Sequence, residues 1–153
     1  MTKRKLITDV IQHSKLLSLS PQTTVATAAR KMFERRVGAV VVTAGGRLVG
    51  IVTERDINFR VVALGRSPET TLLSDIMTRD PDTLPPNAAV GEALEMMQSY
   101  GYRHVPVEQN GTVIGVVSVR DIFMEVKEGL ESDIHEREEF MFGSGYSLPA
   151  VAH

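Results

Sequence analysis

The chain has 153 residues, of which 42% are hydrophobic and 24% are charged, with a formal net charge of −2 and no cysteine. The absence of cysteine excludes disulfides, zinc–cysteine sites and cysteine nucleophiles, and the slight acidity disfavours a surface for nucleic acid. No apolar run reaches the about 18 residues of a membrane-spanning helix. We therefore expect a cytoplasmic protein without a membrane partner.

The first segment, MTKRKLITDVIQHSKLL, starts with basic residues but has neither a continuous apolar core nor a small-residue cleavage site. Apolar residues recur on one face at helical spacing: Leu6, Ile7, Val10 and Ile11. The pattern predicts an amphipathic N-terminal helix rather than a signal peptide.

The sequence repeats itself after 65 residues without a gap. Between residues 25–57 and 90–122, eleven of thirty-three aligned positions are identical, against roughly two expected by chance at ordinary composition. The octapeptides GIVTERDI (50–57) and GVVSVRDI (115–122) belong to this match. Two copies are too few for a solenoid, so we expect them to pack on each other as a pseudo-symmetric pair.

Each copy predicts the element order β-α-β-β-α. A short apolar segment ending in proline (SLSP, TLPP) precedes a helix, and two strands joined by a glycine turn (AGG, QNG) follow. A second helix starts at Thr53 or Ser118. The apolar helix faces are Val25, Ala28, Ala29, Met32 and Phe33 in the first copy, and Val90, Ala93, Leu94 and Met97 in the second. The predicted fold is α/β, with the two repeats packed through their sheets because neither has much core of its own.

The remaining segments connect or extend the copies. SPETTLLSDIMTRDPD predicts a loop with a helical turn near residues 72–77. A long helix with a stripe of Ile122, Val126 and Leu130 follows the second copy and leads to the tail GSGYSLPAVAH. We divide the chain into a first repeat with the N-terminal helix (1–68), a second repeat (69–130), and a helix end with a flexible tail (131–153).

The Thr/Ser-x-x-Asp pattern at the start of each second helix has two interpretations. Thr53 and Ser118 are natural N-caps, and Asp56 and Asp121 suit the positive end of a helix. The same groups suit a ribose phosphate, since free amides and a hydroxyl bind phosphate and a carboxylate accepts ribose hydroxyls. The interpretations are compatible, because one helix end can perform both roles.

The doubled pattern, joined with the segments LSDIMTRD, RHVPV and NGTVIGVVSVRDI, resembles a tandem pair of CBS domains (cystathionine-β-synthase domains), called a Bateman module. The resemblance covers roughly residues 1–128. It implies two clefts between the repeats, related by pseudo-symmetry, that bind adenosine-containing ligands such as AMP, ADP, ATP or S-adenosylmethionine, with NAD also possible. No cofactor or metal is required, and such pairs usually form disc-like homodimers.

The resemblance also implies which residues would bind the ligand. In one cleft, Asp121 would hold the ribose, and Ser118, Arg103 and His104 would lie near the phosphates. The adenine there would meet the backbone of Gly38, Ala39 and Val40 and the segment 14–17, which includes Lys15. Arg120 is a further phosphate candidate, although a solvated arginine is the more ordinary interpretation.

In the other cleft, Asp56 and Thr53 would bind the ribose phosphate, and the adenine would meet Met77, Thr78 and the backbone of His104 and Val105. Arg103 and His104 align with Gly38 and Ala39, so the first copy lacks the basic pair at this point. A ligand rich in phosphate should therefore prefer the Asp121 cleft.

Several functional classes stay open. The favoured one is a stand-alone regulatory module that binds an adenine nucleotide and signals to an unknown protein target or through its assembly state. An interaction scaffold and a nucleic-acid-binding module with non-functional clefts are the alternatives. The histidines at 13, 104, 135 and 153 lack metal-ligand spacing, and no nucleophile elbow or Walker loop is present, so we do not expect an enzyme.

Overall fold

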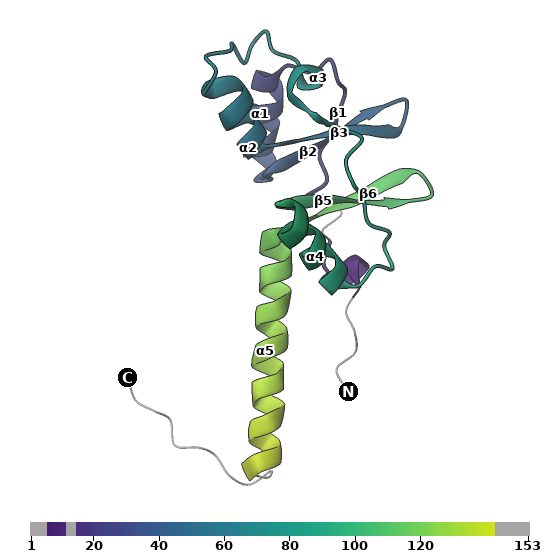
Figure 1. Ribbon diagram of the computed structural model, residues 1–153, viewed down its shortest axis with the longest axis vertical. Coiled ribbons are helices and arrows are strands. Elements are labelled where there is room, and N and C mark those ends of the chain that lie inside the picture. Colours follow the sequence, from purple (N-terminus) through teal and green to yellow (C-terminus); the bar gives the residue numbers. More distant parts are fainter. Residues whose placement is uncertain (1–5, 12–14, 143–153) are drawn as a thin grey trace.

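The structure, a computed structural model, describes residues 6–11 and 15–142, and Figure 1 shows its two repeats stacked, with a long helix extending away from the second. Residues 1–5 and 12–14, which belong to the predicted N-terminal helix, and the predicted tail 143–153 lie outside this description. The predicted α/β class with two β-α-β-β-α repeats is confirmed. Within the described residues, no helix combines the length and apolarity needed to cross a bilayer.

The first repeat contains the elements that its patterning predicts. Strand β1 (Ser18–Leu19) pairs parallel with β2 (Ala39–Ala44), which forms an antiparallel hairpin with β3 (Arg47–Thr53). Helix α1 (Val25–Arg35) begins after Thr24, whose hydroxyl accepts the Thr27 N–H at 3.2 Å. Helix α2 (Glu54–Ile57) continues directly as the π-helical turn η3 (Asn58–Val62).

The second repeat has the same order but a smaller sheet. Leu84 forms an isolated parallel bridge with Val107 where the first repeat has β1. The regular elements are α4 (Val90–Tyr100), the antiparallel pair β5 (His104–Gln109) and β6 (Thr112–Ser118), and α5 (Val119–Phe142).

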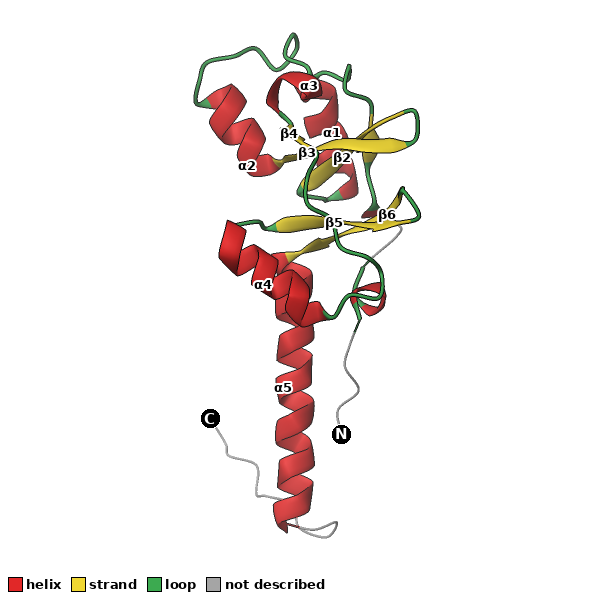
Figure 2. Ribbon diagram, turned by 45° about the vertical axis from the view of Figure 1, so that its right-hand side comes forward, coloured by secondary structure: helices red, strands yellow, loops and turns green. Residues whose placement is uncertain are grey.

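The two hairpins form the middle of the molecule, where β3 contacts β6, and the helices lie on the outer sides (Figure 2). Each hairpin turns through two residues in the left-handed conformation: Gly45, Gly46, Asn110 and Gly111. Glycine and asparagine adopt this conformation at low cost, so the turns predicted at AGG and QNG are confirmed.

The N-terminal segment is not the amphipathic helix that its spacing predicts. Residues 6–11 include the 3-10 turn η1 (Ile7–Asp9), at which the Leu6 N–H donates to the Asp9 carboxylate at 2.9 Å. The connecting segment has the same geometry, because the Leu72 N–H donates to Asp75 at 2.9 Å where α3 (Leu73–Ile76) begins. LITDVI and LLSDIM are therefore a further repeated unit, offset by 66 residues rather than 65.

We call residues 6–11 and 72–77 the leading segments. The segment 6–11 precedes the first repeat but packs on the second, and the segment 72–77 precedes the second repeat but packs on the first. The Ile7 N–H donates to the Ala88 carbonyl of the second repeat at 2.9 Å, and the Leu73 N–H donates to the Thr23 carbonyl of the first at 2.9 Å. These bonds to another segment replace the intrahelical bonds that a longer N-terminal helix would need. The repeats are thus joined by exchanged segments as well as by their sheets.

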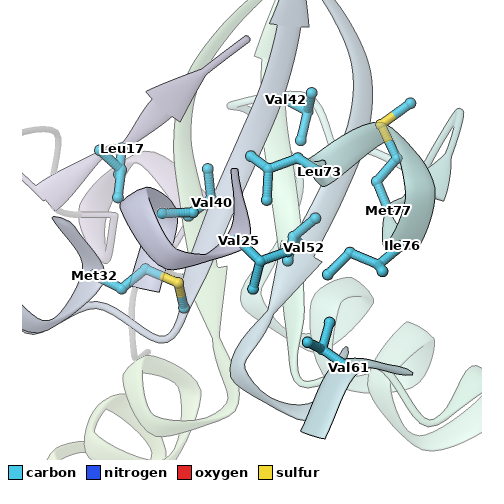
Figure 3. Close-up of a cluster of buried hydrophobic side chains, with 11 residues drawn as sticks. Leu17, Val25, Met32, Val40, Val42, Val52, Val61, Leu73, Ile76 and Met77 are labelled. Carbon is cyan, nitrogen blue, oxygen red and sulfur yellow. The ribbon is translucent and has the colours of Figure 1, made fainter. Parts of the chain in front are cut away.

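The exchange builds both cores. Figure 3 shows Leu73, Ile76 and Met77 packed with Val25 and Val52 in the first cluster of buried side chains. In the second cluster, Ile7 and Ile11 occupy the corresponding place. Complete burial of one such side chain contributes about 1.5–3 kcal/mol, so neither core would be complete without the leading segment.

Helix α5 leaves the body of the protein and continues alone in both views (Figures 1 and 2). Of the predicted stripe, Ile122 is buried, whereas Val126 and Leu130 are 44% and 58% exposed. Phe123 and Ile134 extend the exposed part. Ile122 therefore belongs to the second core, whereas Val126 and Leu130 belong to a solvent-exposed apolar face of α5.

Candidate functional site

Each second helix starts with a capping box whose third residue is aspartate. The Ser118 N–H donates to Asp121 Oδ2 at 2.9 Å, and the Asp121 N–H donates to Ser118 Oγ at 3.1 Å. In the first repeat, Thr53 N–H and Oγ1 both donate to Asp56 Oδ2, at 2.8 and 3.1 Å. The capping interpretation of the Thr/Ser-x-x-Asp pattern therefore holds in both copies.

Strand pairing brings the basic pair to the start of α5. His104 at the beginning of β5 pairs with Ser118 at the end of β6, and the Val119 N–H donates to the Arg103 carbonyl at 2.8 Å. The first repeat has the same bond between the Glu54 N–H and the Gly38 carbonyl, at 3.0 Å. Residues 14 or 16 positions apart in the sequence thus become neighbours because the hairpin folds back on itself.

A cleft of about 1,490 Å³ opens at this point between the repeats. It is lined by most residues that the resemblance assigns to the Asp121 site: Lys15, Gly38, Ala39, Arg103, His104, Ser118, Arg120 and Asp121. Val40 is the exception, because its side chain is fully buried in the first core and does not line the cleft. The volume exceeds that of an ordinary small-molecule pocket, about 300–1,000 Å³, so the cleft has room for a nucleotide.

His104 lies at the contact between the repeats. A Cβ added to Gly38 would lie 3.3 Å from His104 Nε2 and 3.2 Å from Glu54 Oε1, so both side chains crowd the glycine. The His104 Nδ1 atom is buried and has no hydrogen-bond partner among the described residues. Burial lowers the pKa of His104 below its ordinary value, although the carboxylates of Glu54 and Asp121 act in the opposite direction.

The cleft also contains acidic residues that the sequence motifs do not predict. Glu54 comes from α2 of the first repeat, and Glu125 and Glu128 follow Asp121 along one face of α5. The carboxylates that line the cleft, Asp9, Glu34, Glu54, Asp121, Glu125 and Glu128, outnumber its cations, Lys15, Arg36, Arg103 and Arg120. The i, i+4, i+7 spacing of the α5 acids was visible in the sequence, whereas the contribution of Glu54 required the packing of the repeats.

Of the residues assigned to the Asp56 site, His104 lines this cleft, whereas Thr53, Asp56, Met77, Thr78 and Val105 do not. Thr53 and Asp56 are joined by the capping box, and Thr78 is exposed in β4 (Thr78–Arg79), which pairs antiparallel with β3. Met77 and Val105 are buried, one in each core. The described residues also contain no group of three or more His, Asp or Glu side chains suited to a metal ion.

Comparison with known proteins identifies the family. A family profile described as the CBS domain matches residues 7–62 and 73–128. The CBS domain-containing protein CBSCBSPB3 of Arabidopsis thaliana is 36% identical over 146 residues, which is 89% of this chain and 26% of that protein. The chain therefore spans about a quarter of the plant relative.

Solved structures agree on the fold. The crystal structure of an uncharacterized conserved protein from Pyrococcus horikoshii has a TM-score of 0.75 at 31% identity, over 82% of this chain and 95% of that chain. The CBS domain pair of protein MJ0100, solved in complex with 5′-methylthioadenosine and S-adenosyl-L-methionine, has a TM-score of 0.75 at 23% identity, over 82% and 98%. With both repeats matched by the family profile, this chain belongs to the CBS domain proteins as a tandem pair.

Proposed function

We propose that the chain is a regulatory module that binds an adenosine-containing ligand, of the AMP, ADP or ATP class, in the Asp121 cleft. The observation that carries this proposal is the convergence of two repeats on one cavity. Asp121, Ser118 and the basic pair come from the second repeat, and the backbone of Gly38 and Ala39 comes from the first. A ligand that contacts both repeats stabilises one relative placement of them, which is the basis of a regulatory response.

The capping bonds leave room for a ribose. The described hydrogen bonds of Asp121 use its N–H and Oδ2, so Oδ1 can accept a ribose hydroxyl without opening the capping box. Arg103 and Arg120 line the same cavity, and a guanidinium group suits a phosphate. The excess of carboxylates opposes a highly charged ligand, so we expect AMP to bind more tightly than ATP.

The ligand class is tested by calorimetry. AMP, ADP, ATP, S-adenosylmethionine, 5′-methylthioadenosine and NAD would each be titrated into the full chain, its Asp121→Ala variant and an Arg47→Ala control, which removes a charge from the distant β2–β3 hairpin. We expect at least one of the six to bind the wild type and the control, and to lose about tenfold or more in affinity with Asp121→Ala. Failure of all six, or binding that does not respond to Asp121→Ala, would exclude the proposal.

We further propose that the signal is transmitted through a homodimer. Large apolar side chains are exposed on the helices that end each repeat: Phe59 and Val62 in the first, Phe123 and Val126 in the second. A two-fold dimer would bury both sets at once, since an isologous interface uses the same surface of each copy. Light scattering should give twice the chain mass, and Phe59→Glu combined with Phe123→Glu should give the monomer.

A further inference from the structure

The position four residues after each capping aspartate differs between the repeats. Arg60 occupies it in the first repeat and Glu125 in the second, 65 residues apart. Arg60 Nε lies 3.7 Å from Asp56 Oδ1, and Arg60 Nη1 donates to the Ile76 carbonyl at 2.8 Å. One side chain therefore links the carboxylate that a ribose would need to the segment that an adenine would meet.

Asp56 is consequently occupied at both carboxylate oxygens. Oδ2 accepts the N–H and the hydroxyl of Thr53, and Oδ1 faces the guanidinium of Arg60. The Asp56 side chain is only 16% exposed. Four residues after Asp121 the chain has Glu125 instead, a carboxylate that lines the open cleft.

The backbone around Arg60 differs from that of the second repeat. Residues Asn58–Val62 form a π-helical turn, in which the Ala63 N–H donates to the Asn58 carbonyl at 2.9 Å. The equivalent stretch of the second repeat is continuous α-helix within α5. A π-turn widens the helix locally and occurs frequently at functional sites, and here it contains the residue that reaches both Asp56 and Ile76.

The segment that Arg60 contacts also packs closely against Gly50 of β3. Ile76 and Met77 are 1% and 8% exposed, and a Cβ at Gly50 would overlap the Met77 side chain. In the second repeat, Ile11 covers Gly115 in the same manner. The apolar cover is therefore common to both repeats, and the guanidinium is the feature that distinguishes them.

We propose that Arg60 acts as a built-in competitor of the ribose, so that the chain binds one adenosine-containing ligand, in the Asp121 cleft, and would bind a second only after Arg60 is removed. The choice of ligand class rests on the function proposed above. The Arg60 contacts make the two sites of one pseudo-symmetric pair unequal, which a comparison of the two octapeptides does not indicate.

Exchange of the two residues tests the proposal. AMP and S-adenosylmethionine would be titrated into the wild type, Arg60→Glu, Arg60→Glu/Asp56→Ala and the Arg47→Ala control. We expect one site per chain in the wild type and the control, two sites in Arg60→Glu, and one again in the double variant. The reciprocal change, Glu125→Arg, should weaken binding at Asp121 by about tenfold or more, since it places a competing cation beside that carboxylate. Circular dichroism would check that each variant is folded.

The outcomes separate this inference from the proposed function. If the wild type and Arg60→Glu each bind one ligand per chain, the inference is rejected and the proposed function stands. If the wild type binds no ligand and Arg60→Glu binds one that depends on Asp56, the inference stands and the proposed site at Asp121 is rejected. No binding to any folded variant would reject both, and two sites in the wild type would reject the inference.

Discussion

The imidazole of His104 and the backbone of Gly38 meet across the interface of the two repeats, close enough that a Cβ at residue 38 would lie 3.3 Å from His104 Nε2. Glu54 completes this contact from the start of α2. The three residues come from both halves of the chain and line the same cleft. Changes here should therefore affect ligand binding more than they affect the two hydrophobic cores.

Gly38→Ala should weaken ligand binding while the fold persists. The new methyl group would displace the free ends of two flexible side chains, His104 and Glu54, and would narrow the cleft. We expect about a tenfold loss of AMP affinity and a loss of stability of about 1 kcal/mol, the lower end of the cost of overpacking, measured by calorimetry and urea unfolding. Gly129→Ala is the matched control, because nothing lies within 4 Å of its added Cβ and it should stabilise α5 by about 1 kcal/mol. Unchanged AMP binding by Gly38→Ala would place the ligand elsewhere.

The stability of the protein should fall as the pH falls below the ordinary pKa of histidine. Burial lowers the pKa of folded His104, so below about pH 6.5 the unfolded chain binds the additional proton. The stability that neutral His104 contributes is fully present above about pH 6.5 and is lost as the pH falls through the folded pKa. The free energy of unfolding then changes by at most about 1.4 kcal/mol per pH unit. The charged groups that act on the imidazole are Glu54, Asp56, Asp121 and Arg103.

Urea unfolding of the wild type and His104→Asn measures the contribution of His104 to the free energy of unfolding. The measurements would run from about pH 5.5 to about pH 8, which brackets the ordinary pKa of histidine. His104→Asn should reduce the dependence of stability on pH. His135→Asn is the control for loss of an imidazole, since His135 is 73% exposed on α5. Identical slopes for the wild type and His104→Asn would show that burial of the imidazole does not affect the pH dependence.

Glu54→Gln should change the preference of the cleft among adenosine ligands. The substitution removes a carboxylate beside His104 and keeps the side-chain shape. Affinity for ATP relative to 5′-methylthioadenosine should rise by about threefold to tenfold, the value of one charge interaction at a partly solvated site. Competition titrations of both ligands measure the ratio, with the exposed Glu95→Gln as the control. If the ratio of the two affinities equals that of the wild type, the phosphates of bound ATP do not lie near Glu54.

Ile7→Ala and Leu73→Ala should destabilise the protein by similar amounts. Both side chains are fully buried, and each completes the core of the repeat that its segment joins. We expect each substitution to lower the free energy of unfolding, measured with urea, by about 2–5 kcal/mol. The position of Ile7 near the beginning of the sequence should not reduce its effect. Leu64→Ala, at a position 68% exposed, should change stability by less than about 0.5 kcal/mol. A small effect of Ile7→Ala would show that the leading segment is not part of the cooperative core.

The elements of the fold could be read from the sequence because they depend on local patterning. The hairpin turns need glycine or asparagine at Gly46 and Asn110, and the helix starts need a hydroxyl at Thr53 and Ser118, so each is specified within a few residues. The predicted N-terminal helix is wrong because the structure of this segment depends on a distant partner rather than on local patterning. The Ile7 N–H donates to the Ala88 carbonyl, 81 positions away, and that distant partner overrides the helical spacing.

The sequence by itself determined that two copies of one α/β unit exist, where their helices begin, and that Asp56 and Asp121 are equivalent. Tertiary structure decided what distinguishes them. Packing of the repeats placed Glu54 of the first beside His104 of the second. Arg60 lies one helical turn after Asp56, and the fold of the connecting segment brought the Ile76 carbonyl to the same guanidinium. The physical reason is distance: a capping box closes over three residues, whereas the charge that surrounds a carboxylate depends on every segment folded against it.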